Sequence, residues 1–193
     1  MKIILASKSG VRKKILMNYN ISCDVIHSNV DEDQVKESLI EKGADPEIVS
    51  KNLAELKSIK VSNSNPDRLV LGADSVVALK NELINKPRTR DEALKILKKL
   101  NGKVHNLISS VCISKNGSMI WHYTDKAELK MKTMTEDELK LYLSKIEDEK
   151  LYAYNVYQIE GEGKNLFNSI KGDMDTIMGL PIKKIKEYLS NLK

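Results

Sequence analysis

One aspartate stands between two apolar segments, where ordinary packing gives a charge no purpose. Asp74 follows the apolar run 69–71 and precedes the valine-rich run 75–79. Aspartate is rare in strands, and a carboxylate removed from water must be paired, bound to a cation or solvated in a cleft. Because α/β sheets place ligand groups just beyond the ends of their strands, Asp74 is a candidate site residue. The alternative is a turn residue that follows Gly72.

An acidic triplet forms a second candidate group. Asp31, Glu32 and Asp33 lie in the polar segment 28–33, which we interpret as a loop after a predicted strand. Their carboxylates offer the oxygen ligands that a hard cation such as Mg²⁺ prefers. The alternative is an acidic loop that only faces water.

Basic and hydroxyl side chains form a third group, which suits anions. Lys57 lies at the edge of the apolar face of the predicted helix 46–61. Its ammonium group either reaches a phosphate site or extends into water. The segment 7–13, which holds Ser7, Ser9 and Lys13, runs from a predicted strand into a helix N-terminus. Free N–H groups and the helix dipole attract anions at such a place.

Missing motifs exclude several common chemistries. The sequence has no G-x-x-x-x-G-K-[ST] phosphate-binding loop, no complete G-x-G-x-x-G, no H-E-x-x-H and no C-x-x-C. His27, His105 and His122 are far apart and share no motif, so we interpret them as surface or core residues rather than as bases.

Helices and strands that alternate along the chain must position these groups. Hydrophobic periodicity predicts helices over 11–18, 35–42, 46–61, 90–100, 135–145 and 182–192. Ser9, Asp45 and Thr135 are the predicted cap residues of three of them. Strands are predicted over 2–6, 21–27, 69–71, 75–79, 82–86, 107–114 and 118–131. This interleaving is typical of an α/β domain. The polar stretch 62–67 resembles a linker and is a candidate lobe boundary.

Length and composition favour one globular domain over residues 1–193. The 193 residues correspond to about one domain, and 41% apolar with 31% charged residues exclude a disordered chain. No stretch approaches the roughly 20 apolar residues of a membrane span, and the apolar start 3–6 is too short for a signal peptide. Cys23 and Cys112 show no pairing pattern, so we expect reduced thiols and a cytoplasmic protein.

The basic excess does not by itself indicate nucleic acid. The formal net charge is +5, and only four of the 32 basic residues are arginines. The lysines alternate with acids along predicted helices such as 91–100, which is typical of a solvated face. Aromatic residues make up 5% of the chain and provide little for base stacking. We therefore expect neither nucleic acid nor a membrane as a partner.

Taken together, these residues resemble the Maf (septum-formation protein) family of nucleotide pyrophosphatases over nearly the whole chain. Eight short motifs occur in the order that the family has. They are Leu5-Ala6-Ser7-Lys8-Ser9-Gly10-Val11-Arg12 for L-A-S-x-S-P-R-R, Asp31-Glu32 for D-E, Leu53-Ala54-Glu55-Leu56-Lys57 for L-A-x-x-K, Gly72-Ala73-Asp74-Ser75-Val76-Val77 for G-A-D-T-V-V, Lys86-Pro87 for K-P, Leu100-Asn101-Gly102-Lys103-Val104-His105 for L-S-G-x-x-H, Tyr157-Gln158-Ile159-Glu160-Gly161 for Y-G-I-Q-G, and Gly179-Leu180-Pro181 for G-L-P.

The resemblance implies a fold and an activity. The fold is an elongated α/β structure, a mixed sheet with flanking helices and two lobes around a central cleft, related to the inosine triphosphate pyrophosphatases. The activity is the hydrolysis of a nucleoside triphosphate to the monophosphate and pyrophosphate with a divalent cation, Mg²⁺ or Mn²⁺. Such an enzyme performs a house-cleaning task in nucleotide metabolism.

The resemblance also implies residue roles. Asp74 corresponds to the family's proton acceptor, and Glu32 corresponds to the acidic residue that holds the metal ion with it. Arg12, Lys57 and Lys86 correspond to cations that bind the phosphates. Lys57 and Lys86 thereby join the two carboxylates as catalytic residues.

Departures from the family's motifs fall at positions linked to base selection. Gly10-Val11 replaces Pro-Arg, so one arginine is absent, and whether Lys13 compensates for it is open. Ser75 replaces threonine, and Glu160 replaces glutamine. With a glutamate at residue 160 the chain resembles the subgroup that acts on 7-methyl-GTP, since a carboxylate accepts hydrogen bonds from guanine-type N–H donors. The preference of many members for pyrimidines (dTTP, UTP) is therefore open.

Two other functions stay open at this point. One is a Maf-like protein without activity that acts in cell division through interactions, which the absent arginine at Val11 keeps open. The other is a basic nucleic-acid-binding module, whose affinity would fall steeply with salt. Trp121-His122-Tyr123, on a predicted strand, indicates lobe packing or a homodimer surface rather than a site.

Overall fold

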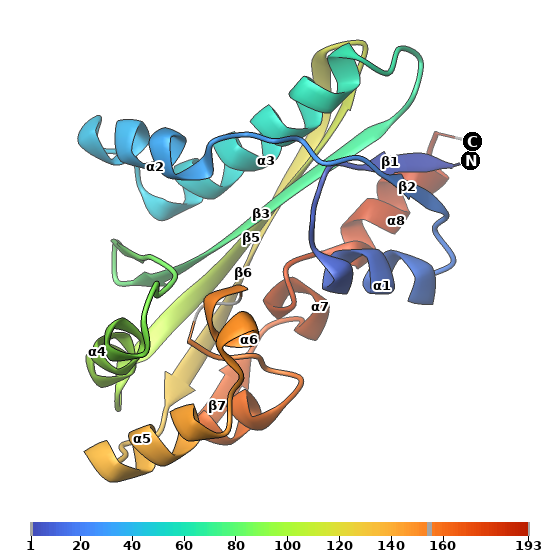
Figure 1. Ribbon diagram of the computed structural model, residues 1–193. Coiled ribbons are helices and arrows are strands. Elements are labelled where there is room, and N and C mark those ends of the chain that lie inside the picture. The colour runs from blue at the N-terminus through green and yellow to red at the C-terminus, as the bar shows by residue number, and fades with distance from the viewer. Residues whose placement is uncertain (1, 154–155, 193) are drawn as a thin grey trace. The chain divides into compact units, whose positions relative to one another are not determined.

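The computed structural model describes residues 2–153 and 156–192, and within them seven strands form one mixed sheet (Figure 1). The strands are β1 (Ile3–Leu5), β2 (Cys23–Val25), β3 (Val70–Leu79), β4 (Glu82–Ile84), β5 (Val104–Lys115), β6 (Ser118–Met131) and β7 (Phe167–Lys171). Their order in the sheet is β2-β1-β3-β5-β6-β7, and β4 pairs with β3 beside this path. β1 runs parallel to β2 and β3, whereas the β3–β4 and β6–β7 pairs are antiparallel.

Helices flank the sheet, which confirms the predicted α/β class. They are α1 (Gly10–Asn18), α2 (Glu32–Glu41), α3 (Pro46–Asn63), α4 (Arg90–Leu100), α5 (Glu136–Ser144), α6 (Asp148–Ala153), α7 (Met174–Ile177) and α8 (Ile182–Ser190), with a 3₁₀ turn η1 (Glu162–Leu166). The side chains of Ser9, Asp45 and Thr135 each accept a backbone N–H at their helix start, as predicted.

Among the helices of the described residues, none combines the length and the apolar character that crossing a membrane requires.

The chain divides into two compact units. Unit 1 contains Met1–Ser75, Ile108–Lys126 and Asp173–Lys193, and unit 2 contains Val76–Leu107 and Ala127–Gly172. The chain passes from unit 1 to unit 2 inside β3, between Ser75 and Val76. The stretch 62–67, which the sequence marks as a candidate lobe boundary, lies within unit 1, at the end of α3 and in the turn that follows it.

The sheet of unit 1 carries a hydrophobic core on each face, because neighbouring residues of a strand point to opposite sides. On one face Ile3 and Leu5 of β1 pack with Leu16 of α1 and with α8. On the other face Ile4 of β1 packs with Val61 of α3. A residue of the central strands therefore faces either α1 and α8 or α3.

Strand β3 continues this alternation through the candidate site residue. Ala73 belongs to the core with α1 and α8, so Asp74 points to the α3 face and Ser75 again to the α1 face. The expectation that Asp74 follows the end of a strand, or a turn at Gly72, is wrong because β3 runs unbroken through both residues.

The acidic triplet lies at a helix start and not in a loop. Helix α2 begins at Glu32, and the Asp31 side chain accepts the backbone N–H of Gln34 at 3.1 Å. The predicted start at Val35 is therefore too late. Carboxylates in the first turn stabilise the positive end of the helix dipole, which explains why the acidic residues begin the helix.

Unit 2 contains a fully buried histidine, which the sequence alone left as a surface or core residue. Nε2 of His105 on β5 lies 2.9 Å from the hydroxyl of Tyr157, and its ring centroid lies 5.8 Å from that of Phe167. Its Nδ1 has no hydrogen-bond partner among the described residues. Burial lowers the pKa of His105 from the usual 6.5 to about 4, so the ring is neutral at pH 7.

We expect His105 to make the stability of the protein depend on pH. The unfolded chain binds a proton on this side chain below about pH 6.5, whereas the folded chain binds it only near pH 4. This contribution to stability is therefore fully present above the unfolded pKa. It falls by up to roughly 3 kcal/mol as the pH drops through that window. Denaturant unfolding of the wild-type protein and of His105→Gln measures the effect. An equal pH dependence for both proteins would contradict it.

Candidate functional site

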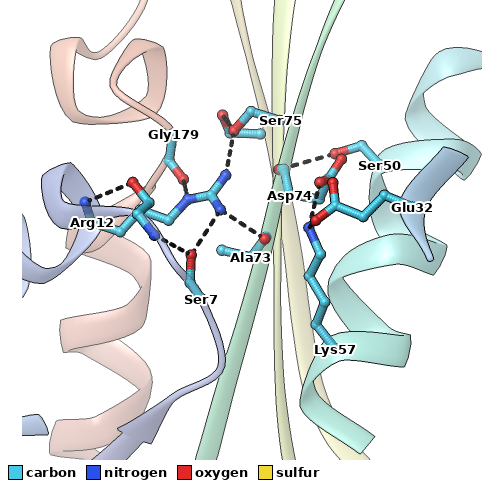
Figure 2. A network of polar contacts seen from close by, with 11 residues as sticks. Ser7, Arg12, Glu32, Ser50, Lys57, Ala73, Asp74, Ser75 and Gly179 are labelled. Carbon is cyan, nitrogen blue, oxygen red and sulfur yellow. Dashed lines mark hydrogen bonds and ion pairs between the residues drawn. The ribbon is translucent and has the colours of Figure 1, made fainter. Parts of the chain in front are cut away.

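Three charged side chains of unit 1 meet beside β3. Nζ of Lys57 on α3 lies 2.8 Å from Oδ1 of Asp74 on β3 and 2.8 Å from Oε1 of Glu32 on α2 (Figure 2). One ammonium group therefore bridges two carboxylates that are far apart in the sequence. The sequence singles out all three residues as catalytic candidates, and the structure brings them together.

A glycine allows α3 to approach β3 this closely. A Cβ atom on Gly72 would lie 2.1 Å from the carbonyl oxygen of Ala54 and 2.8 Å from the backbone nitrogen of Ser58. Both atoms belong to the turns of α3 next to Lys57. A side chain at residue 72 would therefore push the ammonium group away from Asp74, so Gly72 serves close packing and not a turn.

The exposure of the three side chains increases from β3 outward. The side chains of Asp74 and Lys57 are each 6% exposed, whereas that of Glu32 is 41% exposed. Removing a carboxylate or an ammonium group from water costs several kcal/mol, so the buried pair is stable only while both partners remain. Lys57 thus does not extend to water, and Glu32 forms the solvent-facing end of the cluster.

The carboxylates of this cluster fit a hard divalent cation. Oδ2 of Asp74 is buried and has no hydrogen-bond partner in the described part of the chain. Asp74 and Glu32 both reach one nitrogen, and Mg²⁺ is typically held by one or two carboxylates together with waters and substrate phosphates. Within 2–153 and 156–192, no group of three or more His, Cys, Asp or Glu side chains is arranged to hold a metal ion. A cation here would therefore take further ligands from the substrate.

Arg12 lies on the other side of β3, away from this cluster (Figure 2). Its Nε donates to the carbonyl oxygen of Gly179 at 2.9 Å. Its Nη1 donates to the carbonyl oxygen of Ala73 at 2.9 Å and to Oγ of Ser7 at 3.3 Å. Its Nη2 donates to Oγ of Ser75 at 3.1 Å. Four of the five guanidinium N–H groups are thus bonded to uncharged protein acceptors.

The predicted anion-binding residues lie at the start of α1 and just before it. Oγ of Ser9 accepts the backbone N–H of Arg12 at 3.3 Å, and Oγ of Ser7 accepts that of Ser9 at 3.2 Å. Lys13 is exposed, and Val11 is half-buried against the core of unit 1. The structure therefore places Ser7 and Ser9 around Arg12 and leaves Lys13 at the surface.

Two of the predicted site residues belong to unit 2. Lys86 is exposed after β4, and Glu160 is exposed and accepts a hydrogen bond from Nε2 of Gln158 at 3.0 Å. The cluster described above consists of unit 1 residues alone, so the roles of Lys86 and Glu160 stay predictions.

Sequence reasoning missed the serines that hold these groups in place. Oγ of Ser50 on α3 donates to the carbonyl oxygen of Asp74 at 3.1 Å. Ser109 on β5 lies 2.8 Å from Oγ of Ser75 and donates to the carbonyl oxygen of Thr176 at 2.8 Å. A hydroxyl within the apolar pattern of a predicted strand, as at Ser109, is the signal that points to such a bond.

A family model and known sequences match the chain over almost its full length. A family model described as Maf-like protein matches residues 2–192. A nucleoside triphosphate pyrophosphatase of Pelagibacter ubique is 66% identical over 100% of this chain and 98% of its own length. A 7-methyl-GTP pyrophosphatase of Brucella abortus is 37% identical over 94% of this chain and 91% of its own length. A solved HAM1 protein of Coxiella burnetii gives a TM-score of only 0.41 at 14% identity, over 68% of this chain and 73% of that chain.

Replacing Lys57 by methionine tests the buried ion pair. The variant leaves the Asp74 carboxylate buried without its partner, so we expect the free energy of unfolding to fall by about 3–5 kcal/mol. Denaturant unfolding at pH 7 measures the loss, and the double variant Lys57→Met, Asp74→Asn should regain part of it.

The matched control is Lys60→Met on the same helix, where the lysine is exposed and its Nζ donates to the carbonyl oxygen of Asn29 at 2.6 Å. This variant should lose no more than about 1 kcal/mol, because it gives up one exposed hydrogen bond and no buried ion pair. Equal losses in Lys57→Met and Lys60→Met would show that the pair with Asp74 contributes nothing particular to stability.

Proposed function

The chain belongs to the Maf family, and we propose that Asp74, Lys57 and Glu32 form the centre at which it hydrolyses its substrate. Relatives that match almost the whole chain bear pyrophosphatase names, and the chain is a nucleoside triphosphate pyrophosphatase. The observation that carries the residue assignment is the gathering of two carboxylates around one ammonium group, with Oδ2 of Asp74 left unbonded.

The proposed reaction is the attack of water on the α-phosphorus of the triphosphate. The water oxygen bonds to this phosphorus as the bond to the oxygen that bridges the α- and β-phosphates breaks, and pyrophosphate leaves. Lys57 holds Oδ1 of Asp74, so that Oδ2 is the oxygen available to accept the proton of the water. General-base catalysis of this kind typically contributes about 10²–10⁴-fold.

Neutralisation of phosphate charge is the other requirement of this reaction, because phosphoryl transfer depends mainly on positioning and electrostatic stabilisation. Asp74 and Glu32 would hold Mg²⁺ or Mn²⁺, and such an ion, when bound, neutralises the phosphates and polarises the α-phosphoryl group. An ionised carboxylate has about four lone-pair sites, so Asp74 can hold a cation and still accept a proton.

Two exposed cations, together with two hydroxyls at the start of α1, complete the proposed phosphate contacts. Lys86 and Lys13 are both exposed, and Ser7 and Ser9 lie at the N-terminus of α1, where the helix dipole attracts an anion. Arg12 stays outside this set. A bidentate phosphate clamp needs two free N–H groups, and four of the five in Arg12 are already bonded to the protein.

The two other functions gain no specific support. Lysines on helices pair with glutamates of the same or a neighbouring helix, as solvated helix faces do. Such pairs join Lys98 and Lys140 to Glu136, and Lys184 to Glu187. A continuous basic surface for nucleic acid is therefore not favoured on these helices.

Replacing Asp74 by asparagine tests the proposed base. We expect turnover per folded molecule to fall by about 10²–10⁴-fold, because the amide cannot take up a proton. Lys57 keeps its ion pair with Glu32 in this variant. The assay offers a panel of canonical and modified triphosphates with Mg²⁺ or Mn²⁺, and it measures pyrophosphate separately from orthophosphate.

The matched control for this assay is Asp67→Asn, which removes an exposed carboxylate of the same unit. It should keep wild-type turnover. A folded Asp74→Asn protein that retains its activity would remove Asp74 from the mechanism. Release of orthophosphate alone by the wild type would indicate a phosphatase.

Base selection is proposed to involve Val11, Ser75 and Glu160. A glutamate at residue 160 favours a guanine-type base, because its carboxylate accepts N–H donors. We expect Glu160→Gln to lower kcat/KM for 7-methyl-GTP relative to dTTP and UTP, and Glu162→Gln, an exposed neighbour, to leave the ranking unchanged. Parallel kcat/KM measurements on these substrates check this. If the ranking of the triphosphates by kcat/KM were unchanged in Glu160→Gln, residue 160 would have no role in base selection.

A further inference from the structure

We infer that Arg12 is a positioning residue for Asp74 rather than a direct ligand of the phosphates. The guanidinium group contacts β3 on both sides of Asp74. Its Nη1 donates to the carbonyl oxygen of Ala73 at 2.9 Å, and its Nη2 donates to Oγ of Ser75 at 3.1 Å. One rigid, planar group thus fixes the residues before and after the carboxylate. The inference rests on the proposed function of Asp74 as the base.

The two faces of β3 are held by different helices. Ala73 and Ser75 face the side of α1, from which Arg12 comes, whereas Asp74 faces α3 and Lys57 (Figure 2). Arg12 therefore fixes the backbone of Asp74 from one side while Lys57 fixes its carboxylate from the other.

Arg12 is itself anchored at a third place. Its Nε donates to the carbonyl oxygen of Gly179 at 2.9 Å. A Cβ atom on Gly179 would lie 3.0 Å from Oγ of Ser75 and 3.3 Å from Nε and Nη2 of Arg12, and the φ of +96° at this residue is strained for any other amino acid. Glycine at this position leaves the space that the guanidinium group occupies.

A directed chain of hydrogen bonds continues from Arg12. Ser109 donates its one hydroxyl proton to the carbonyl oxygen of Thr176 at 2.8 Å. Ser75 must therefore donate to Ser109 at 2.8 Å, while it accepts from Arg12 at 3.1 Å. These hydrogen bonds fix the rotamer of Ser75. They thereby also fix the position of its Oγ, which accepts from Nη2 of Arg12 beside Asp74.

The charges agree with this geometry. The four hydrogen bonds of the guanidinium group all go to uncharged acceptors, and within residues 2–153 and 156–192 no carboxylate bonds to it directly. Burial lowers the pKa of Arg12, and the carboxylates of Asp74 and Glu32 act in the opposite direction. The attraction across β3 thus favours the arrangement in which Arg12 stays beside the strand that carries Asp74.

Three variants in the full-length protein test the inference. Arg12→Lys keeps the charge but loses the planar fork, and Arg12→Gln loses the charge. Lys14→Gln removes an exposed cation of the same helix and serves as the control. We expect kcat, normalised to the number of sites that bind the substrate analogue, to fall on the order of 10²-fold in both Arg12 variants. The reason is that a small misplacement of a catalytic group lowers the rate by about this factor. The Kd for a non-hydrolysable triphosphate analogue with a methylene bridge between the α- and β-phosphates should stay within about threefold.

Hydrogen exchange of the peptide that covers β3 gives a second readout. The Arg12 variants should exchange faster at this peptide than the wild type and Lys14→Gln do. Gly179→Ala, which crowds the guanidinium group without removing it, should show the same loss of kcat with Kd kept.

Two results would overturn the inference. A rise of about tenfold or more in Kd in the Arg12 variants would make Arg12 a phosphate ligand. Unchanged kcat per binding-competent site would leave it with a stabilising role only. A wild-type protein that turned over no triphosphate would contradict the proposed function instead, while the exchange comparison would still report whether Arg12 fixes β3.

Discussion

The close contact between α3 and β3 is the constraint on which the rest of the site depends. A carboxylate inside a sheet is stable only with a partner, and Lys57 reaches Asp74 because Gly72 leaves no side chain between helix and strand. The same contact lets Glu32 join from α2 at the solvent-facing end. The absence of a Cβ atom at Gly72 thus allows two carboxylates and one ammonium group from three different elements to meet.

This arrangement explains why so little of the chain's charge takes part in the site. Many lysines lie on helix surfaces, and several of them pair with acids there. The cations that contact the site strand β3 are buried or half-buried, with Lys57 on one face of the strand and Arg12 on the other. Strand alternation, rather than the net charge of +5, decides which cation meets the carboxylate and which meets the backbone.

Local signals made much of the fold predictable, and long-range contacts limited the rest. Ser9, Asp45 and Thr135 marked helix starts correctly because capping is a matter of neighbours in sequence. The sequence offers a turn as the alternative at Gly72, because the actual reason for this glycine, the close approach of α3, lies in another element. The family resemblance supplied Asp74, Glu32 and Lys57 as a set, but not that one ammonium group joins them. Short elements such as α6, α7 and β7 were not predicted, because too few residues carry their pattern.

In the proposed reaction, water attacks the α-phosphorus and releases pyrophosphate intact. Single-turnover hydrolysis in oxygen-18-labelled water, followed by mass spectrometry of both products, locates the oxygen that water contributes. Attack at the α-phosphorus puts the label into the nucleoside monophosphate and leaves pyrophosphate unlabelled. Label in pyrophosphate would place the attack on the β-phosphorus and would contradict the proposed reaction.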